Sequence, residues 1–173
     1  MVFYLRERGR SSVIYESSAV VASLFYDNQR SFEVSFGLER KGDPSQPAFT
    51  IDAILRSLEV PVTDWPSGYS ATSLADAKRL TQKIATILAL HAKQLLEGEN
   101  EAWKKIAEQR QKDIRDYALE KSLLTARYEA EVAWRKKDYA SVVKAFKPLR
   151  AALTAAEVGK LEFAEEQSGK AGD

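Results

Sequence analysis

The sequence predicts an α+β protein: an N-terminal antiparallel β-meander with a short covering helix, then an all-helical C-terminal half with one long helix. In residues 1–50 apolar and polar side chains alternate in short runs, as in strands with one buried face. Beyond residue 72 apolar side chains recur every three or four residues, as in helices. We therefore expect a sheet, a short helix and a loop in residues 1–72. The helical region of residues 73–173 would pack on the sheet or project from it, and one continuous domain is the alternative.

The strongest strand signal lies in residues 31–39, where every second side chain is apolar. Residues 19–26 are rich in β-branched and aromatic side chains, and turn-favouring residues join the two runs into a hairpin. Residues 2–5 and 13–15 flank a glycine and indicate a second hairpin. We expect three to five antiparallel strands.

Helix signals begin at Thr50, which precedes apolar residues at helical spacing and predicts a short helix that ends before Pro61. Ser73 has the form of an N-cap for a longer helix, which Gly98 would end. Neither glycine nor proline follows until Pro148, so that a helix of about 37 residues and roughly 55 Å could occupy residues 100–137.

Apolar side chains on this long helix repeat at alternating steps of four and three, as in a helical hairpin or short coiled coil. The candidate oligomer seam consists of Trp103, Ile114, Tyr117, Leu124 and Tyr128. Two basic members of the repeat, Arg110 and Lys121, weaken the case for a self-sufficient zipper. Packing inside the protein is the other interpretation of Trp103, and also of Trp134.

The segment 126–153 places Ala130 and Tyr139 as one tetratricopeptide-type helical pair does, and it resembles that family. In that family a small residue packs helix against helix, and a glycine-containing turn precedes the second helix. Lys137 stands where glycine is usual, and Thr154 where a closing proline is usual. The match covers about a sixth of the chain and occurs once, whereas a solenoid needs about three stacked units. The resemblance therefore implies a local helical hairpin and no array, and no family is suggested for the whole chain.

Composition excludes several kinds of chemistry. The chain has no cysteine and a single histidine, His91, which leaves no thiol nucleophile, no zinc site and no multi-histidine metal centre. We expect His91 to be a buried or half-buried residue on an apolar helix face. The glycine-rich loops that bind phosphates are absent. We therefore expect no catalytic set, no bound metal and no cofactor.

One pattern could still serve catalysis. Glu39-Arg40-Lys41 has the form of the metal-binding triplet of magnesium-dependent nucleases, with Asp27 as the nearest upstream carboxylate. In a hairpin, however, Asp27 and Glu39 would lie roughly 26 Å apart, too far to share one ion. Asp43 or Asp52 could supply the missing ligand, so the nuclease stays an alternative.

Charge gives little support to nucleic-acid binding. The chain has 26 Lys and Arg against 25 Asp and Glu, for a net charge of +1. Residues 104–150 are locally basic, and Arg6, Arg8 and Arg10 would share one face of the first hairpin. Acidic residues alternate with the basic ones at helical spacing, which is typical of solvated helix faces. No long apolar segment or signal peptide is evident, so we expect a cytoplasmic protein without membrane contact.

By elimination, the sequence favours a non-catalytic protein-binding protein, such as a toxin-neutralising immunity protein or an accessory subunit of a bacterial defence complex. The candidate contact residues are Asp64, Trp65 and Tyr69 in the long loop 59–72, because exposed aromatic side chains often anchor interfaces. Alternatively, Trp65 folds back over the sheet and covers the core. The other functional alternatives are a homo-oligomeric helical scaffold, which would be a homodimer at its simplest, and a nucleic-acid-binding accessory protein.

Overall fold

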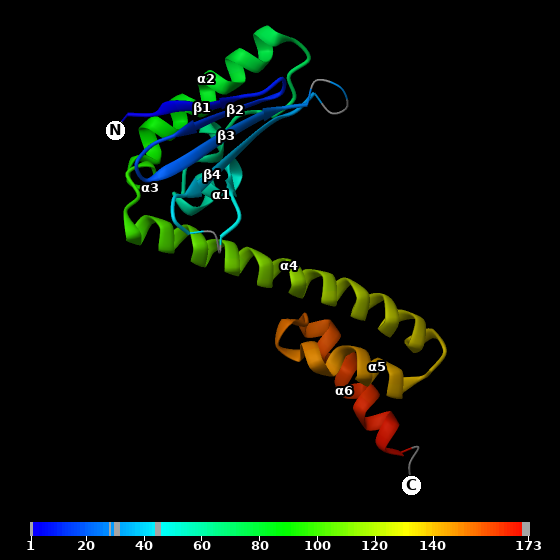
Figure 1. Ribbon diagram of the computed structural model, residues 1–173. Helices are drawn as coiled ribbons and strands as arrows, with labels where there is room; N and C mark the ends of the chain where they lie inside the picture. Colours follow the sequence, from blue (N-terminus) through cyan, green and yellow to red (C-terminus); the bar gives the residue numbers. More distant parts are fainter. Residues whose placement is uncertain (1, 28, 30–31, 44–45, 171–173) are drawn as a thin grey trace. The chain divides into compact units, whose positions relative to one another are not determined.

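The computed structural model describes residues 2–27, 29, 32–43 and 46–170. The chain forms two compact units, Met1–Gln111 and Lys112–Asp173. Unit 1 holds the sheet, and unit 2 is helical (Figure 1). The predicted α+β class, with an N-terminal antiparallel sheet and a helical C-terminal half, is confirmed.

The sheet is an antiparallel meander in the order β1-β2-β3-β4-β5. Its strands are β1 (Tyr4–Arg8), β2 (Ser12–Glu16), β3 (Val20–Tyr26), β4 (Val34–Arg40) and β5 (Phe49–Thr50). Both predicted hairpins are present, although residues 28, 30 and 31 of the second turn lie outside the described part. β5 was not predicted, because two residues are too few to show an alternating pattern.

One face of the sheet forms the core of unit 1. Ala22 of β3 lies opposite Leu38 of β4, and the alternate residues on this face include the buried Val20, Val34 and Phe36. Helices α1 (Ile51–Ser57) and α2 (Leu74–His91) bury their apolar side chains in the same cluster.

Side-chain caps begin both helices as predicted. The Thr50 hydroxyl accepts a hydrogen bond from the N–H of Ala53 at 3.4 Å, and the Ser73 hydroxyl accepts one from the N–H of Asp76 at 3.1 Å.

The helix predicted to run from Ser73 to Gly98 is divided. α2 ends at His91 and a short helix, α3 (Lys93–Leu96), follows the buried Ala92. His91 is exposed, so the expectation that it is buried was wrong. The physical reason is that Ala92 and Leu95 take the buried positions where the chain leaves α2.

Three helices end with a residue in the left-handed backbone conformation. The residues are Glu59 after α1, Gly98 after α3 and Lys137 after α4, with φ values of 56°, 80° and 56°. At Lys137 the N–H donates to the carbonyl of Trp134, and the next N–H, that of Asp138, donates to the carbonyl of Ala133, both at 3.0 Å. This pair of hydrogen bonds satisfies carbonyls that the helix end leaves open.

The long helix is continuous: α4 spans Asn100–Arg135, 36 residues. Its first turns belong to unit 1, where Trp103 is 5% exposed and its ring N–H donates to the carbonyl of Leu95 at 2.9 Å. α2, α3 and these first turns all contribute to the core of unit 1. The division between the units therefore falls inside α4, whereas the sequence pattern suggested a change after residue 72.

Arg110 fastens α4 to the loop before β5. Its guanidinium carbon lies 3.4 Å from the ring centroid of Phe49. Its two terminal nitrogens donate to the carbonyls of Pro47 and Ala48 at 2.8 Å each. Burial lowers the pKa of Arg110 from its usual range. Because the Arg110 side chain makes these contacts within unit 1, it is not available to contact another helix as a member of the predicted repeat on α4.

Unit 2 contains the rest of α4, then α5 (Tyr139–Phe146), a 3₁₀ helix over Lys147–Ala152, and α6 (Ala155–Lys170). Its core is small and rich in alanine, which lets helices approach closely. The buried residues are Ala126, Ala130, Ala133, Val142, Phe146, Leu161 and Ala164. The predicted helical hairpin at 126–153 is present, and its resemblance to the tetratricopeptide family stays a prediction.

Candidate interaction surfaces

The loop after α1 holds the aromatic residues that the sequence singled out. Trp65 is half-buried against the core of unit 1, and its ring N–H donates to the carbonyl of Val60 at 2.9 Å. The Trp65 carbonyl accepts from the ammonium of Lys83, also at 2.9 Å. These are the contacts expected when Trp65 covers the core.

Tyr69 and Asp64 are held differently. Tyr69 is half-buried, and its hydroxyl donates to the carboxylate of Asp52. Burial, together with that carboxylate, raises the pKa of Tyr69 above its usual range. Asp64 is exposed and accepts a hydrogen bond only from the neighbouring Thr63 hydroxyl, at 3.4 Å, among the described contacts. The structure thus gives Trp65 and Tyr69 internal partners, and their role in binding another protein stays a prediction.

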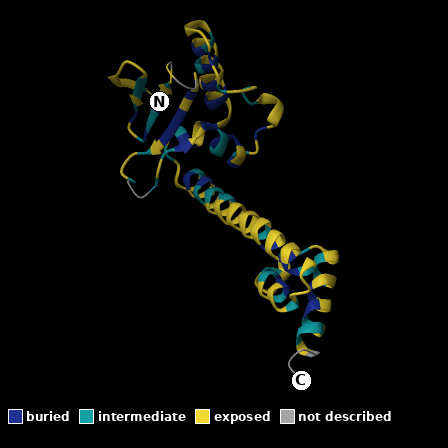
Figure 2. Cartoon of the chain, turned by 90° about the vertical axis from the view of Figure 1, so that its right-hand side faces the viewer, coloured by how far each residue is buried: buried dark blue, intermediate teal, exposed yellow. Residues whose placement is uncertain are grey.

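A row of apolar side chains lies exposed along the middle of α4, whose central turns are coloured as exposed in Figure 2. Ile114, Tyr117, Leu124 and Tyr128 are 54%, 62%, 53% and 73% exposed. Their steps of three, seven and four residues keep them on one side of the helix. We call these four residues the outer stripe.

The outer stripe points away from the core of unit 2. At 100° per residue, Leu124 and Tyr128 each lie about 160° around the helix from the buried Ala126. Lys121 lies between Tyr117 and Leu124 on the same side, with its ammonium 5.4 Å from the ring centroid of Tyr117. Trp103, the fifth predicted member of the seam, is buried in unit 1 and is not part of the outer stripe.

The triplet suggested for a nuclease is not assembled with other carboxylates. Glu39 lies opposite Val21, which is six residue steps, about 20 Å along an extended strand, from Asp27 just after the end of β3. The Asp52 carboxylate is engaged by Tyr69. Across the described ranges, no group of three or more His, Asp or Glu side chains could hold a metal ion. The geometry therefore adds no support to metal-dependent cleavage.

The face of the sheet away from the helices carries an ion network. Glu16 accepts from Arg6 at 3.3 Å and pairs with Lys41, which lowers the pKa of Glu16, mainly through its contact with Lys41. A β-bulge between Leu5 and Glu7 changes the register of β1. The expectation that Arg6, Arg8 and Arg10 share one face was therefore wrong: Arg6 lies with Glu16 on this face, whereas Arg8 lies opposite Val13 on the other.

On the other face, the β1–β2 hairpin and the first turns of α2 enclose a groove of about 470 Å³, which we call the hairpin groove. Arg8, Arg10 and Lys78 line it together with Tyr15 and Leu74. Sequence reasoning missed this site, because its two walls are 60 residues apart and neither carries a recognisable motif. The only signal was the density of arginine in the first hairpin.

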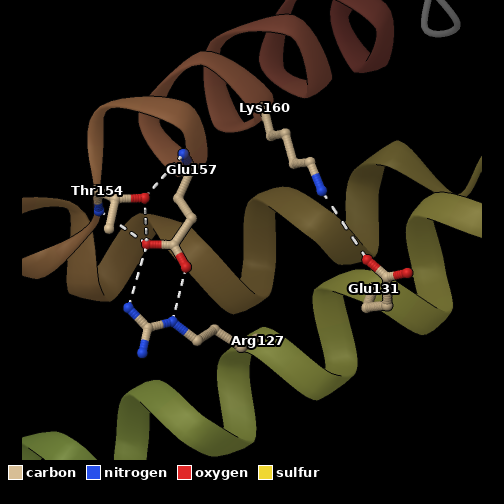
Figure 3. A network of polar contacts seen from close by, with 5 residues as sticks. All are labelled: Arg127, Glu131, Thr154, Glu157 and Lys160. Atoms are coloured by element: carbon tan, nitrogen blue, oxygen red, sulfur yellow. Dashed lines mark hydrogen bonds and ion pairs between the residues drawn. The ribbon is translucent and has the colours of Figure 1, made fainter.

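A polar network ties the start of α6 to α4 (Figure 3). Glu157 accepts hydrogen bonds from Arg127 at 2.6 Å and from the N–H and hydroxyl of Thr154 at 2.8 and 2.9 Å. Beside it, Lys160 pairs with Glu131 at 3.9 Å. Arg127, followed by the Thr154 N–H, lowers the pKa of Glu157 to about 2. The carboxylate is therefore ionised at neutral pH and serves as a cap and an ion pair, not as an acid.

Comparisons with known proteins identify no relative: the chain matches no family model, and neither a curated protein nor a solved structure shows significant similarity to it. Within the described part of the chain, no helix is both long enough and apolar enough to cross a membrane.

Proposed function

We propose that this protein acts by binding another protein and carries out no reaction of its own. The observation that carries the proposal is the outer stripe of α4, in which two tyrosines and two aliphatic side chains are exposed in one row. Single exposed apolar residues are common on protein surfaces, but a contiguous row is typical of a contact surface. Tyrosine is also enriched among residues that dominate binding energies.

The kind of protein that we propose is a toxin-neutralising immunity protein or an accessory subunit of a bacterial defence complex. Both act through complementary shape and charge, which needs an exposed surface and no reactive group. The aromatic loop of unit 1, with Trp65 and Tyr69, is a second candidate contact region, because both residues are half-buried and not fully enclosed.

Capture from an extract of the source cells tests the proposal. The stripe variant combines Tyr117→Glu and Leu124→Glu. The matched control combines Gln111→Glu and Ser122→Glu, which adds the same charge at exposed positions of the same helix. We expect one protein species to be captured by the wild type and the control, and to be lost with the stripe variant. Equal capture by all three proteins would contradict a role for the outer stripe.

A second candidate function is a homo-oligomeric scaffold, in which the partner is a second copy of the chain. A parallel pair would place Lys121 against its own copy, which is unfavourable. An antiparallel pair can instead set Tyr117 against Tyr128 and bring Glu120 near Arg127 of the other copy, twice by symmetry. Arg127 already binds Glu157, so it would be shared between two carboxylates.

Light scattering separates the two candidates. A homodimer predicts twice the chain mass at micromolar concentration and a single chain mass for the stripe variant. A monomeric wild type at that concentration would remove the scaffold and leave a different protein as the partner.

A further inference from the structure

The hairpin groove combines an apolar floor with a basic rim. The floor is formed by side chains of β2, β3 and α2, of which Tyr15 is 39% and Leu74 is 82% exposed. The rim carries Arg8 and Arg10 on the hairpin. A volume of about 470 Å³ lies within the range of ligand-binding clefts. The groove is thus large enough for more than one side chain of a partner.

Three cations line the described part of the groove, two on the hairpin and one on α2. Arg8, Arg10 and Lys78 are exposed, and among the described residues none of them forms an ion pair or a side-chain hydrogen bond. Of the described residues that line the groove, none is acidic. On the opposite face of the sheet, by contrast, Arg6 and Lys41 are both paired with Glu16. The hairpin groove is therefore a concentration of unpaired positive charge in a chain of nearly zero net charge.

We propose that the hairpin groove binds an acidic peptide segment of a partner protein. Its carboxylates would pair with Arg8, Arg10 and Lys78, and hydrophobic side chains between them would cover the apolar floor. Charge complementarity of this kind steers association and selects partners.

Two features favour such a peptide over a nucleic acid. Nucleic-acid binding draws on many phosphate contacts, whereas the described lining of the groove offers three cations. The most exposed apolar side chain of the groove is the aliphatic Leu74, at 82%, whereas the aromatic Tyr15 is 39% exposed, and stacking on bases needs accessible aromatic rings. The proposal uses none of the residues of the outer stripe. It therefore goes beyond the proposed function and can be tested independently of it.

Fluorescence anisotropy with defined probes tests the proposal on the full chain. The probe is a short fluorescein-labelled peptide in which aspartate and glutamate alternate with leucine and phenylalanine. One comparison peptide replaces the acids by their amides, and another replaces the hydrophobic residues by serine. We expect each replacement to weaken binding by about tenfold or more. We also expect the affinity for the acidic peptide to fall as the salt concentration rises.

Matched variants locate the site. The groove variant combines Arg10→Glu and Lys78→Glu, and the control combines Lys104→Glu and Lys112→Glu, exposed lysines outside the groove, so that the net charge changes equally. We expect about a tenfold loss of peptide affinity in the groove variant and at most about a twofold loss in the control. Leu74→Ser, which removes an exposed side chain and leaves the core intact, supplies an independent variant with the same expected direction.

Three results would overturn the proposal. The first is no binding of the acidic peptide to the wild type at low salt, and the second is an equal loss of peptide affinity in the groove variant and the control. The third is tighter binding of a single-stranded oligonucleotide of equal charge than of the peptide. The last result would assign the groove to nucleic acid. Circular dichroism checks that each variant keeps the wild-type fold.

Discussion

Lys137 occupies a backbone conformation that suits glycine. Its φ of 56° lies in the left-handed region, where a side chain costs roughly 1 kcal/mol. We expect Lys137→Gly to raise the free energy of unfolding by up to about 1 kcal/mol, measured by urea unfolding. Lys136→Gly, one residue earlier and outside the left-handed region, should instead lower it by about 0.5–1 kcal/mol. Shifts of the same sign in the two variants would contradict this account of the helix end.

Of the three left-handed turns that end helices, only one could be predicted from its residue type. Gly98 has a φ of 80° and lies so close to Ala19 that a Cβ at position 98 would be 2.7 Å from the Ala19 Cβ. Glycine is the usual residue for such a turn, so the sequence could indicate it. Glu59 adopts the same turn, but glutamate carries no such signal. At Lys137 the expected helix 100–137 and a resemblance to helical pairs in which glycine is usual indicated the helix end, whereas lysine itself carries no such signal.

Trp65 has contacts that predict a structural cost on removal. Its half-buried ring packs on the core of unit 1 and donates to the carbonyl of Val60. We expect Trp65→Ala to lower the free energy of unfolding by about 2 kcal/mol or more, and Asp64→Ala to change it by less than about 0.5 kcal/mol. If Trp65→Ala left stability unchanged but weakened capture of a partner, Trp65 would be an interface anchor and no part of the core.

At the scale of the element, opposite sides of α4 differ in what they contribute. Leu124 is exposed, whereas Ala130 is 3% exposed in the core of unit 2. We expect Leu124→Gln to change the free energy of unfolding by less than about 0.5 kcal/mol, and Ala130→Leu to lower it by about 1–3 kcal/mol through overpacking. A large loss from Leu124→Gln in a monomeric protein would show that the outer stripe is already covered.

The contact between α4 and α6 predicts a dependence of stability on pH. The folded pKa of Glu157 is lowered from 4.5 to about 2, so the Glu157 contribution is complete above the unfolded pKa and is lost as the pH falls through the folded one. We expect Glu157→Gln to be less stable than the wild type at neutral pH, with a difference that shrinks between about pH 5 and about pH 2. Urea unfolding across this range measures it, and a difference independent of pH would rule out the ionised carboxylate as its source.

Elements with one buried face could be predicted from the sequence, and breaks inside elements could not. The alternating residues of β4 predicted a strand there, and the N-caps Thr50 and Ser73 predicted where α1 and α2 begin. The break at Ala92 was missed because alanine is a good helix former and only packing ends α2 there. The bulge near Arg6 was missed for a similar reason: it changes the register without a glycine or proline.

At the scale of the whole molecule, the two units have separate cores with no residue in common. Phe146→Ala should therefore act on unit 2, where Phe146 is 3% exposed, at a cost of about 3 kcal/mol or more. We expect hydrogen exchange to speed up in α5 and α6 and to stay unchanged in β3 and β4. Equal acceleration in β3 would mean that the two units unfold as one.

The fold class could be predicted because the hydrophobic period changes once along the chain, from two to about 3.6 residues. The candidate surfaces were predicted only in part. The repeat on α4 gave Ile114, Tyr117, Leu124 and Tyr128, but periodicity alone could not show that Trp103 is enclosed by the core of unit 1. The hairpin groove could not be predicted at all, because it depends on a tertiary approach between β1, β2 and α2.

The central claim is that an exposed surface of α4 meets another protein, and photo-crosslinking in living cells tests it most directly. A photoreactive phenylalanine derivative replaces Leu124 in the outer stripe in one strain and the exposed Ser122 in another. We predict a single crosslinked species of defined mass from position 124 and little or none from position 122. Position 124 giving no adduct, or both positions giving the same diffuse set, would contradict the claim.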